Sequence, residues 1–210
     1  MTIPTMPQPR LLWRHVVINT HASWLHGDPR GFRTRRHRIH SSGDYRDPPP
    51  RGEHRGLYVH QRRESSPEVK IPLKVRALVG RALVRFLLDQ RLRVVAVAVA
   101  KVHAHALVEM ADNIREVKHI TGEANRFSSR AVTDSIPRAL WSAGGKFVRV
   151  EDDDHLRSAY DYVLYDQGPW AWTWSFRDRS MEGVIGRKRP KQAQRRPTPK
   201  LIPERRTAPE

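Results

Sequence analysis

Two histidines stand two residues apart in the apolar stretch 99–110, "VAKVHAHALVEM". Successive side chains of a strand point to opposite faces, so His103 and His105 are expected on one face, roughly 7 Å apart along the chain. Neutral imidazole nitrogens bind divalent cations, so the pair can supply two ligands to one metal ion. The alternative is a pair of core histidines held by hydrogen bonds, which is the usual outcome for an isolated His-x-His pattern.

A tyrosine and a carboxylate share a helix face further along, in "HLRSAYDYVLYDQG" (155–168). Tyr162 and Asp166 are four residues apart, and residues at that spacing are neighbours on a helix surface. If this helix packs on the strand that carries the histidines, the phenol and the acid can meet them. The alternative is an amphipathic edge tyrosine and a solvated acid, although the carboxyl end of a helix disfavours an anion.

The elements that must position these residues can be read from apolar spacing and from residues that start and stop helices. Valine-rich or alternating stretches predict strands at 11–20, 92–100, 103–110, 146–150 and 170–176. Helical spacing predicts helices at 71–90, 112–131 and 152–167, with Asp112 and the acids 152–154 at two amino-terminal ends and Gly168 as a stop. Helices grouped on an antiparallel sheet make an α+β fold the natural class.

Two of the predicted helices carry an apolar stripe opposite basic residues. In helix 71–90 the stripe comprises Val75, Leu78, Val79, Ala82 and Phe86, and in helix 112–131 it comprises Ile120, Ala124, Phe127 and Ala131. Basic side chains of the second helix lie elsewhere on its surface: Arg115, Lys118, Arg126 and Arg130. These four are candidate contacts to a phosphate backbone, with a solvated helix face as the alternative.

The composition favours a polyanionic partner. Lys and Arg number 39 against 22 Asp and Glu, a formal charge of +17. A ribosome-associated protein or a merely solvated basic surface are the alternatives. No apolar window of about 18 residues and no signal-type segment occur, so we expect no membrane partner and a cytoplasmic, nucleoid-associated protein. The chain has no cysteine, so a metal must be held by histidine and by carboxylate or amide oxygen.

The sequence divides into a core domain and basic appendages. Residues 1–10 are expected to be a flexible lead, 11–176 the domain, and 177–210 a disordered basic tail rich in proline. Within the domain, 21–68 breaks the element pattern with Gly, Pro, Ser, Asp and many arginines. We interpret it as a long basic surface insertion that contacts nucleic acid.

The His-apolar-His strand, followed some fifty to sixty residues later by Asp161-Tyr162-Val163, resembles the HUH single-tyrosine transposases. The nearest branches are the REP-associated tyrosine transposases and related insertion-sequence proteins, and the resemblance covers residues 11–176. It implies a ferredoxin-like HUH fold, Tyr162 as the nucleophile, and His103, His105 and Asp166 as the metal ligands. The stretch "WAWTWSF" (170–176) is similar to the aromatic strand that follows in this family. The long insertion, and Ala100-Lys101-Val102 where the family has a proline-containing turn, are departures.

The activity implied by the resemblance is cleavage and rejoining of single-stranded or hairpin DNA through a 5′-phosphotyrosine link. Two imidazoles and a carboxylate suit Mg²⁺ or Mn²⁺, with Zn²⁺ as the alternative. Tyr160 and Tyr165 are weaker nucleophile candidates, because neither shares a face with Asp166 as well as Tyr162 does. Such a protein would act as a monomer or a homodimer. Two other functions remain open: a nucleic-acid-binding protein of the same fold that is inactive or domesticated, and an RNA-binding basic protein.

Overall fold

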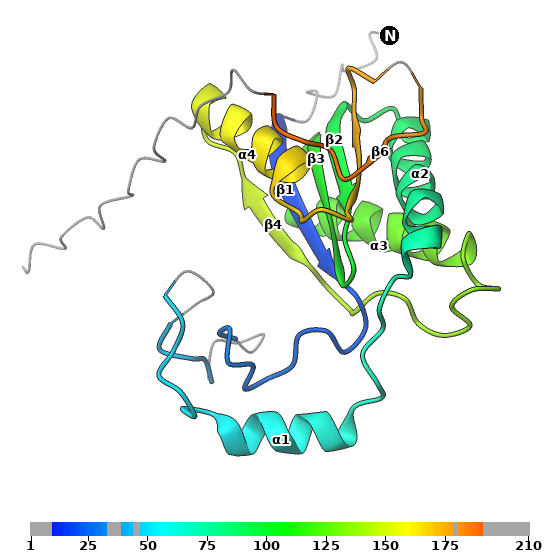
Figure 1. Ribbon diagram of the computed structural model, residues 1–210. Helices are drawn as coiled ribbons and strands as arrows, with labels where there is room; N and C mark the ends of the chain where they lie inside the picture. Colours follow the sequence, from blue (N-terminus) through cyan, green and yellow to red (C-terminus); the bar gives the residue numbers. More distant parts are fainter. Residues whose placement is uncertain (1–9, 33–38, 44–46, 179, 191–210) are drawn as a thin grey trace, which may run out of the picture.

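The computed structural model describes residues 10–32, 39–43, 47–178 and 180–190. These residues form four helices and a six-stranded antiparallel sheet, with strand order β4-β1-β3-β2-β5-β6 (Figure 1). The strands are β1 (Leu11–Asn19), β2 (Val94–Val99), β3 (His103–Ala111), β4 (Lys146–Arg149), β5 (Trp172–Ser175) and β6 (Val184–Ile185). The helices are α1 (Arg55–Glu64), α2 (Leu73–Asp89), α3 (Ile114–Arg130) and α4 (Asp153–Tyr165). The predicted class, helices packed on an antiparallel sheet, is confirmed.

The two faces of the sheet are covered by different helices. Figure 1 shows α4 lying across one face, while α2 and α3 cover the other. Alternate residues of β1 and β3 serve the two sides, as the twofold period of a strand requires. Val16 and Ile18 belong to the large apolar core under α2 and α3. A smaller cluster under α4 contains Leu107 and Val163.

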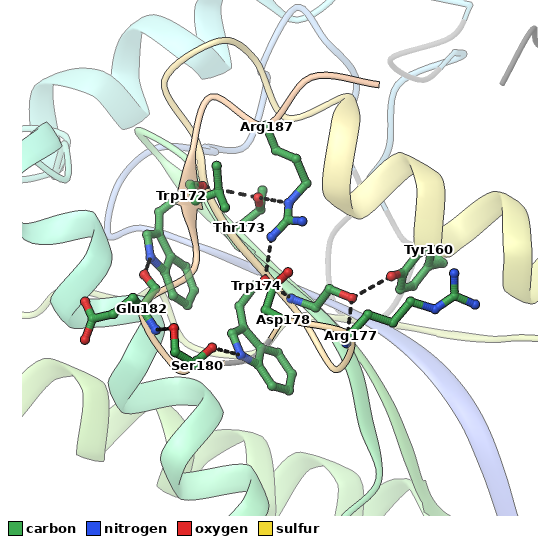
Figure 2. Close-up of polar contacts among 11 residues, drawn as sticks. Tyr160, Trp172, Thr173, Trp174, Arg177, Asp178, Ser180, Glu182 and Arg187 are labelled. Atoms are coloured by element: carbon green, nitrogen blue, oxygen red, sulfur yellow. Dashed lines mark hydrogen bonds and ion pairs between the residues drawn. The ribbon is translucent and has the colours of Figure 1, made fainter. Parts of the chain in front are cut away.

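The centre of the predicted aromatic strand 170–176 forms β5, in which both indoles are buried, whereas Trp170 lies before β5 and is 62% exposed. Trp172 and Trp174 are 1% and 6% exposed, and their Nε1 atoms donate to the carbonyls of Glu182 and Ser180 at 2.7 and 3.2 Å (Figure 2). A Cβ added to Gly80 of α2 would lie 2.0 Å from the ring of Trp172, so the glycine makes room for that indole. These tryptophans therefore pack β5 against α2.

The segment that follows β5 differs from the disordered tail expected from 177 onward. Strand β6 pairs with β5, and the Arg187 guanidinium bonds Asp178 at 2.5 Å and the Thr173 hydroxyl at 3.0 Å (Figure 2). Buried strand edges need hydrogen-bond partners, and β6 supplies them to the backbone of β5, while Arg187 bonds the side chains of Thr173 and Asp178. Residues 191–210, like the lead at 1–9, lie outside the described residues.

The insertion 21–68 contains helix α1, which the sequence did not indicate. Figure 1 shows α1 lying away from the sheet, and none of its residues is buried. Its apolar residues, Leu57, Tyr58 and Val59, are consecutive, so they do not show the i, i+3, i+4 spacing that marks the other helices.

Helix starts agree with the prediction for α4 and differ for α3. The Asp152 side chain caps α4 by accepting from His155 N at 2.7 Å. For α3 the cap is Asn113, which accepts from Arg115 N at 3.0 Å, while the predicted cap Asp112 pairs with Arg14 at 3.1 Å. Among the described residues, no helix combines the length and the apolar character needed to cross a bilayer.

Candidate active site

Three histidines gather on the face of the sheet that α4 covers. His103 and His105 point to one side of β3, and their ring centroids lie 4.9 Å apart. From the neighbouring strand β1, His15 Nε2 lies 2.8 Å from His105 Nδ1. The antiparallel pairing of the two strands sets this contact, since Val17 is opposite His105 and His15 is opposite Leu107. The histidine pair is therefore a triad in space.

Helix α4 brings Tyr162 to the histidines. Its ring centroid lies 5.5 Å from that of His105 and 5.8 Å from that of His15, in edge-to-face arrangements. The Tyr162 side chain remains 38% exposed, whereas His105 is 5% exposed. A phenol that is open to solvent on one side and borders buried imidazoles on the other can be reached by a substrate.

Gln167, just beyond α4, connects the tyrosine to the histidines. Its Oε1 lies 3.1 Å from His103 Nε2, and its Nε2 donates to the Tyr162 carbonyl at 2.8 Å. Because a carbonyl only accepts, the second bond directs the amide nitrogen to Tyr162 and the amide oxygen to His103. Gln167 thus offers an oxygen ligand beside an imidazole nitrogen.

Asp166, the acid predicted to complete the metal site, lies against a cation. Its Oδ2 pairs with Arg189 at 3.2 Å, and the same guanidinium holds Asp161 at 3.0 Å. In the part of the chain that the structure describes, no group of three or more His, Cys, Asp or Glu side chains is placed to hold a metal ion. The set of His103, His105 and Asp166 is therefore not assembled in this arrangement, and Gln167 is the residue that meets His103.

Burial keeps the three imidazoles neutral. It lowers the pKa of His15 from 6.5 to about 4, with Lys146 and then His155 adding to the effect. Burial also lowers the pKa of His103, against the hydrogen bond that His103 donates to the Gln167 amide oxygen, which raises it. The pKa of His105 falls well below 6.5, through burial first and then the neighbouring histidines. Neutral imidazoles are the form that binds metal ions.

Two cations border the cluster from different segments. Lys146 of β4 acts on His15, and Arg30 of the insertion acts on His103. Arg30 is fixed by two bonds to Asp28, at 2.6 and 2.8 Å, and lies 4.2 Å from the ring of Trp24. A phosphate bound at the histidines would lie within the electrostatic reach of both cations.

The other tyrosines of α4 are engaged elsewhere. Tyr160 Oη is bonded to Ser175 Oγ at 2.5 Å, on the β5 side of the helix (Figure 2). Tyr165 lies under Arg189, 5.0 Å from its guanidinium, and burial raises the pKa of its phenol. Of these three phenols, only Tyr162 lies against the histidine rings.

Comparisons with known proteins include a distant structural likeness. No family model matches the sequence, and no curated protein matches it either. A solved structure described as a REP-associated tyrosine transposase bound to a REP hairpin is similar with a TM-score of 0.39 and 10% identity, covering 78% of this chain and 71% of that one. A likeness at this level carries no functional weight, so function must be inferred from the site itself.

The basic residues predicted to contact DNA lie away from the histidines. All four occur on α3, which packs on the opposite face of the sheet from α4. Arg126 pairs with Glu123 one turn earlier, and Arg115 lies in the first turn. Lys118, Arg126 and Arg130 line a groove beside the helix. The structure thus separates these cations from Tyr162.

Three residues near the site were missed in the sequence. His15 occupies an odd-numbered position in "LLWRHVVIN", so strand alternation could have placed it with Val17 on one face. Lys146 was seen only as the start of a strand, and its proximity depends on β4 pairing with β1. Gln167 was expected as the last residue of helix 152–167, but the helix ends at Tyr165 and the Gln167 amide oxygen lies 3.1 Å from His103 Nε2.

Proposed function

We propose that this protein is a metal-dependent single-strand DNA endonuclease and strand transferase that works through a 5′-phosphotyrosine link on Tyr162. The observation that carries the proposal is the convergence of Tyr162 with the neutral imidazoles of His103 and His105, linked through Gln167. An exposed phenol beside buried neutral imidazoles has a clear use in covalent phosphoryl transfer. It has little use as core packing.

The order of the elements supports a ferredoxin-like HUH fold. Strands β4-β1-β3-β2 with α2 and α3 on one face correspond to a doubled split βαβ arrangement. In that arrangement α4 is an addition on the free face, and it delivers the tyrosine to the central strands β1 and β3. The order of the motifs along the chain is the one that the family resemblance implies.

His103, His105 and Gln167 would hold the cation, Mg²⁺ or Mn²⁺, with Zn²⁺ as the alternative. The 3.1 Å between His103 Nε2 and Gln167 Oε1 is close to the ~3.0 Å between adjacent ligands of an octahedral ion with ~2.1 Å bonds. His105 presents its Nε2, because its Nδ1 faces His15. When bound, the ion would polarise the scissile phosphate and orient it.

The remaining chemistry belongs to the chain's own residues. Tyr162 Oη attacks the phosphorus, the new P–O bond to tyrosine forms, and the P–O3′ bond breaks. The phenolic proton passes to solvent on the exposed side of the ring, and the departing 3′ oxygen takes a proton to become a hydroxyl. Arg30 and Lys146 offset the charge of the phosphate. A second 3′ hydroxyl reverses these steps and frees Tyr162, so joining needs no added energy source.

The test is a covalent adduct assay. The substrate is single-stranded hairpin DNA with its label in the segment whose 5′ phosphate becomes joined to Tyr162. It is incubated with protein and Mn²⁺, and the products are separated on a denaturing gel. We expect a protein–DNA band that disappears with Tyr162→Phe and persists with Tyr160→Phe, the matched control on the same helix. A band that survives in Tyr162→Phe, or no band with any hairpin tested, contradicts the proposal.

The choice of third ligand is tested separately by Mn²⁺ binding in the absence of DNA. We expect Gln167→Ala to weaken Mn²⁺ binding by ~10-fold or more, and Asp166→Ala to leave it within ~2-fold of the parent. The reverse result would assign the site to Asp166 after release of its Arg189 pair.

A binding protein of the same fold that does not cleave is the second candidate. The observation that favours it is the ion pair of Asp166 and Asp161 with Arg189, which engages the predicted acid ligand. This candidate predicts DNA binding that is indifferent to Mn²⁺ and to His103→Ala, with no adduct.

A further inference from the structure

A groove runs beside α3 on the face of the sheet opposite Tyr162. It lies between α3 and the segment 139–147 and has a volume of about 690 Å³. We name it the α3 groove. Residues on its two sides include Lys118, Gly122, Arg126 and Arg130 from the helix, and Trp141 and Phe147 from across it.

The α3 groove is one-sided in charge. Three of its lining side chains are cations, and none of the described residues that line it is Asp or Glu. Arg126 is partly offset by Glu123, whereas Lys118 and Arg130 extend from exposed positions at the two ends. A cationic groove with the half-buried ring of Phe147 on its far side has the surface chemistry of a single-strand nucleic-acid channel.

The cations are spaced along the groove and not clustered at one point. Lys118 and Arg130 are twelve residues apart on α3, which corresponds to ~18 Å of helix. A lone phosphate or a mononucleotide would use one end of such a row. A strand with several successive phosphates can contact the whole row.

Gly122 lines the α3 groove. Gly122 is in the middle of α3, where glycine is a poor helix former, and a Cβ added there would meet no atom within 4 Å. Neither backbone conformation nor core packing therefore requires glycine at this position. The open space over Gly122 belongs to the groove.

We propose that the α3 groove binds a second segment of unpaired DNA, distant from the phosphate that Tyr162 attacks. The inference rests on the proposed function for its substrate class, and adds where a flanking strand lies. Since the groove and Tyr162 are on opposite faces of the sheet, one strand can reach both only by passing around an edge. Short oligonucleotides fill the site at Tyr162, and longer ones reach both that site and the α3 groove.

The test compares labelled single-stranded oligonucleotides of ~8 and ~30 nucleotides bound to the full-length protein in Mn²⁺. We expect Gly122→Leu to weaken binding of the long strand ~10-fold and to leave binding of the short strand nearly unchanged. Gln90→Leu is the control for an added apolar side chain, because Gln90 is exposed at the carboxyl end of α2 and does not line the α3 groove. Thermal unfolding of both variants checks that each is folded.

A second experiment tests the cations of the α3 groove through the salt dependence of binding. The double variant Lys118→Gln, Arg130→Gln should reduce the magnitude of the slope of log affinity against log salt by ~1.4 for the long strand, since each single-strand phosphate contact contributes ~0.7. Arg85→Gln, which removes an exposed α2 arginine paired with Asp89, should change the slope by less than ~1.

The outcomes separate this inference from the proposed function. If Gly122→Leu is folded and binds the long strand as tightly as the parent, the α3 groove does not bind DNA. This holds even if Tyr162 forms an adduct. If Gly122→Leu weakens binding and the parent protein forms no adduct, DNA binding by the α3 groove is supported and the proposed endonuclease activity is contradicted. A loss that is equal for short and long strands also contradicts a second segment.

Discussion

The two faces of the β1–β3 pair are made from neighbouring residues and do different work. On one face Val16, Ile18 and Ala104 are at most 5% exposed and pack under α2 and α3. On the other face His15 and His105, one residue away in each strand, form a polar cluster beside Tyr162. A twofold strand period lets one ribbon provide core packing and chemistry at once.

The helices cover the two faces of the sheet to different extents. The α2–α3 side forms the larger core, and α3 and α2 are 17 residues each. The α4 side has a smaller apolar cluster, and its 13-residue helix leaves Tyr162 38% exposed. Changes on the first face should therefore reduce stability, and changes on the second should reduce activity. Four predictions test that division.

The largest effect is expected from His103→Ala. Losing a ligand beside Gln167 should reduce adduct formation by ~100-fold or more, while thermal unfolding changes little. His119→Ala, on the exposed surface of α3 and on the opposite face of the sheet from Tyr162, serves as the histidine control. An unchanged adduct rate in His103→Ala would break the comparison on the chemical side.

Ile18→Ala tests the opposite face of the same ribbon. Removing this buried side chain should lower the free energy of unfolding by ~2–4 kcal/mol, because a cavity is left under α2 and α3. Urea denaturation measures the loss. The adduct rate per folded molecule should stay at the parent value. A fall in that rate without loss of stability would mean that the two faces are not independent.

The pH dependence of stability sharpens the comparison. His15 has a folded pKa of about 4 against 6.5 when exposed, so between these values the unfolded chain binds more protons and stability falls as pH falls. His15 alone lowers the free energy of unfolding by ~3 kcal/mol as the pH falls from 6.5 to 4. His103 and His105 act in the same direction. Urea titrations with a chelator present measure this loss.

The control for this pH effect is His15→Gln, which cannot take up a proton. Its stability should depend less steeply on pH over the same window. A slope identical to that of the parent would show that His15 is not held neutral by burial.

The smallest effect is expected on Mn²⁺ affinity when the support of His105 is removed. His15→Leu should weaken binding ~10-fold, because His105 Nδ1 loses the partner that orients its ring. His15→Gln, which can still form a hydrogen bond, should recover part of the loss. Equal affinities in Leu and Gln variants would exclude an orienting role for His15.

Elements with strong periodic or capping signals could be predicted from the sequence. The alternation around His103 and His105 gave β3, and the acids at 152–154 gave the start of α4. The shared face of the two histidines followed from the strand period alone. Because Tyr162 lies three turns into a well-defined helix, its placement could be expected once that helix packs on β3.

Predictions of helix faces were less accurate where polar groups are buried. In α3 we expected Phe127 in the core, but it is 42% exposed, and Ser128 is buried with a hydrogen bond from Trp141 Nε1. In α2 the buried face includes Arg76, which donates to the Ile71 and Trp170 carbonyls, while Leu78 is 40% exposed. Such partners are distant in sequence, so hydrophobicity alone points to the wrong stripe.

The contacts of Asp166 and Gln167 depend on how α4 ends. In a helix that runs to residue 167, Tyr162 and Asp166 are four residues apart and share a face, so Asp166 was favoured as the partner of Tyr162. The helix ends at Tyr165, which leaves Asp166 at Arg189 and turns Gln167 to His103. Arg189 follows β6, an element without any recognisable sequence pattern.

The most direct test of the central claim is to locate the DNA on the protein. After incubation with a hairpin and Mn²⁺, the adduct is digested and the nucleotide-bearing peptide is identified by mass spectrometry. The account predicts a nucleotide joined through phosphate to Tyr162, within the peptide that spans 158–177. Attachment at Tyr160, Tyr165 or any residue outside α4 would contradict it.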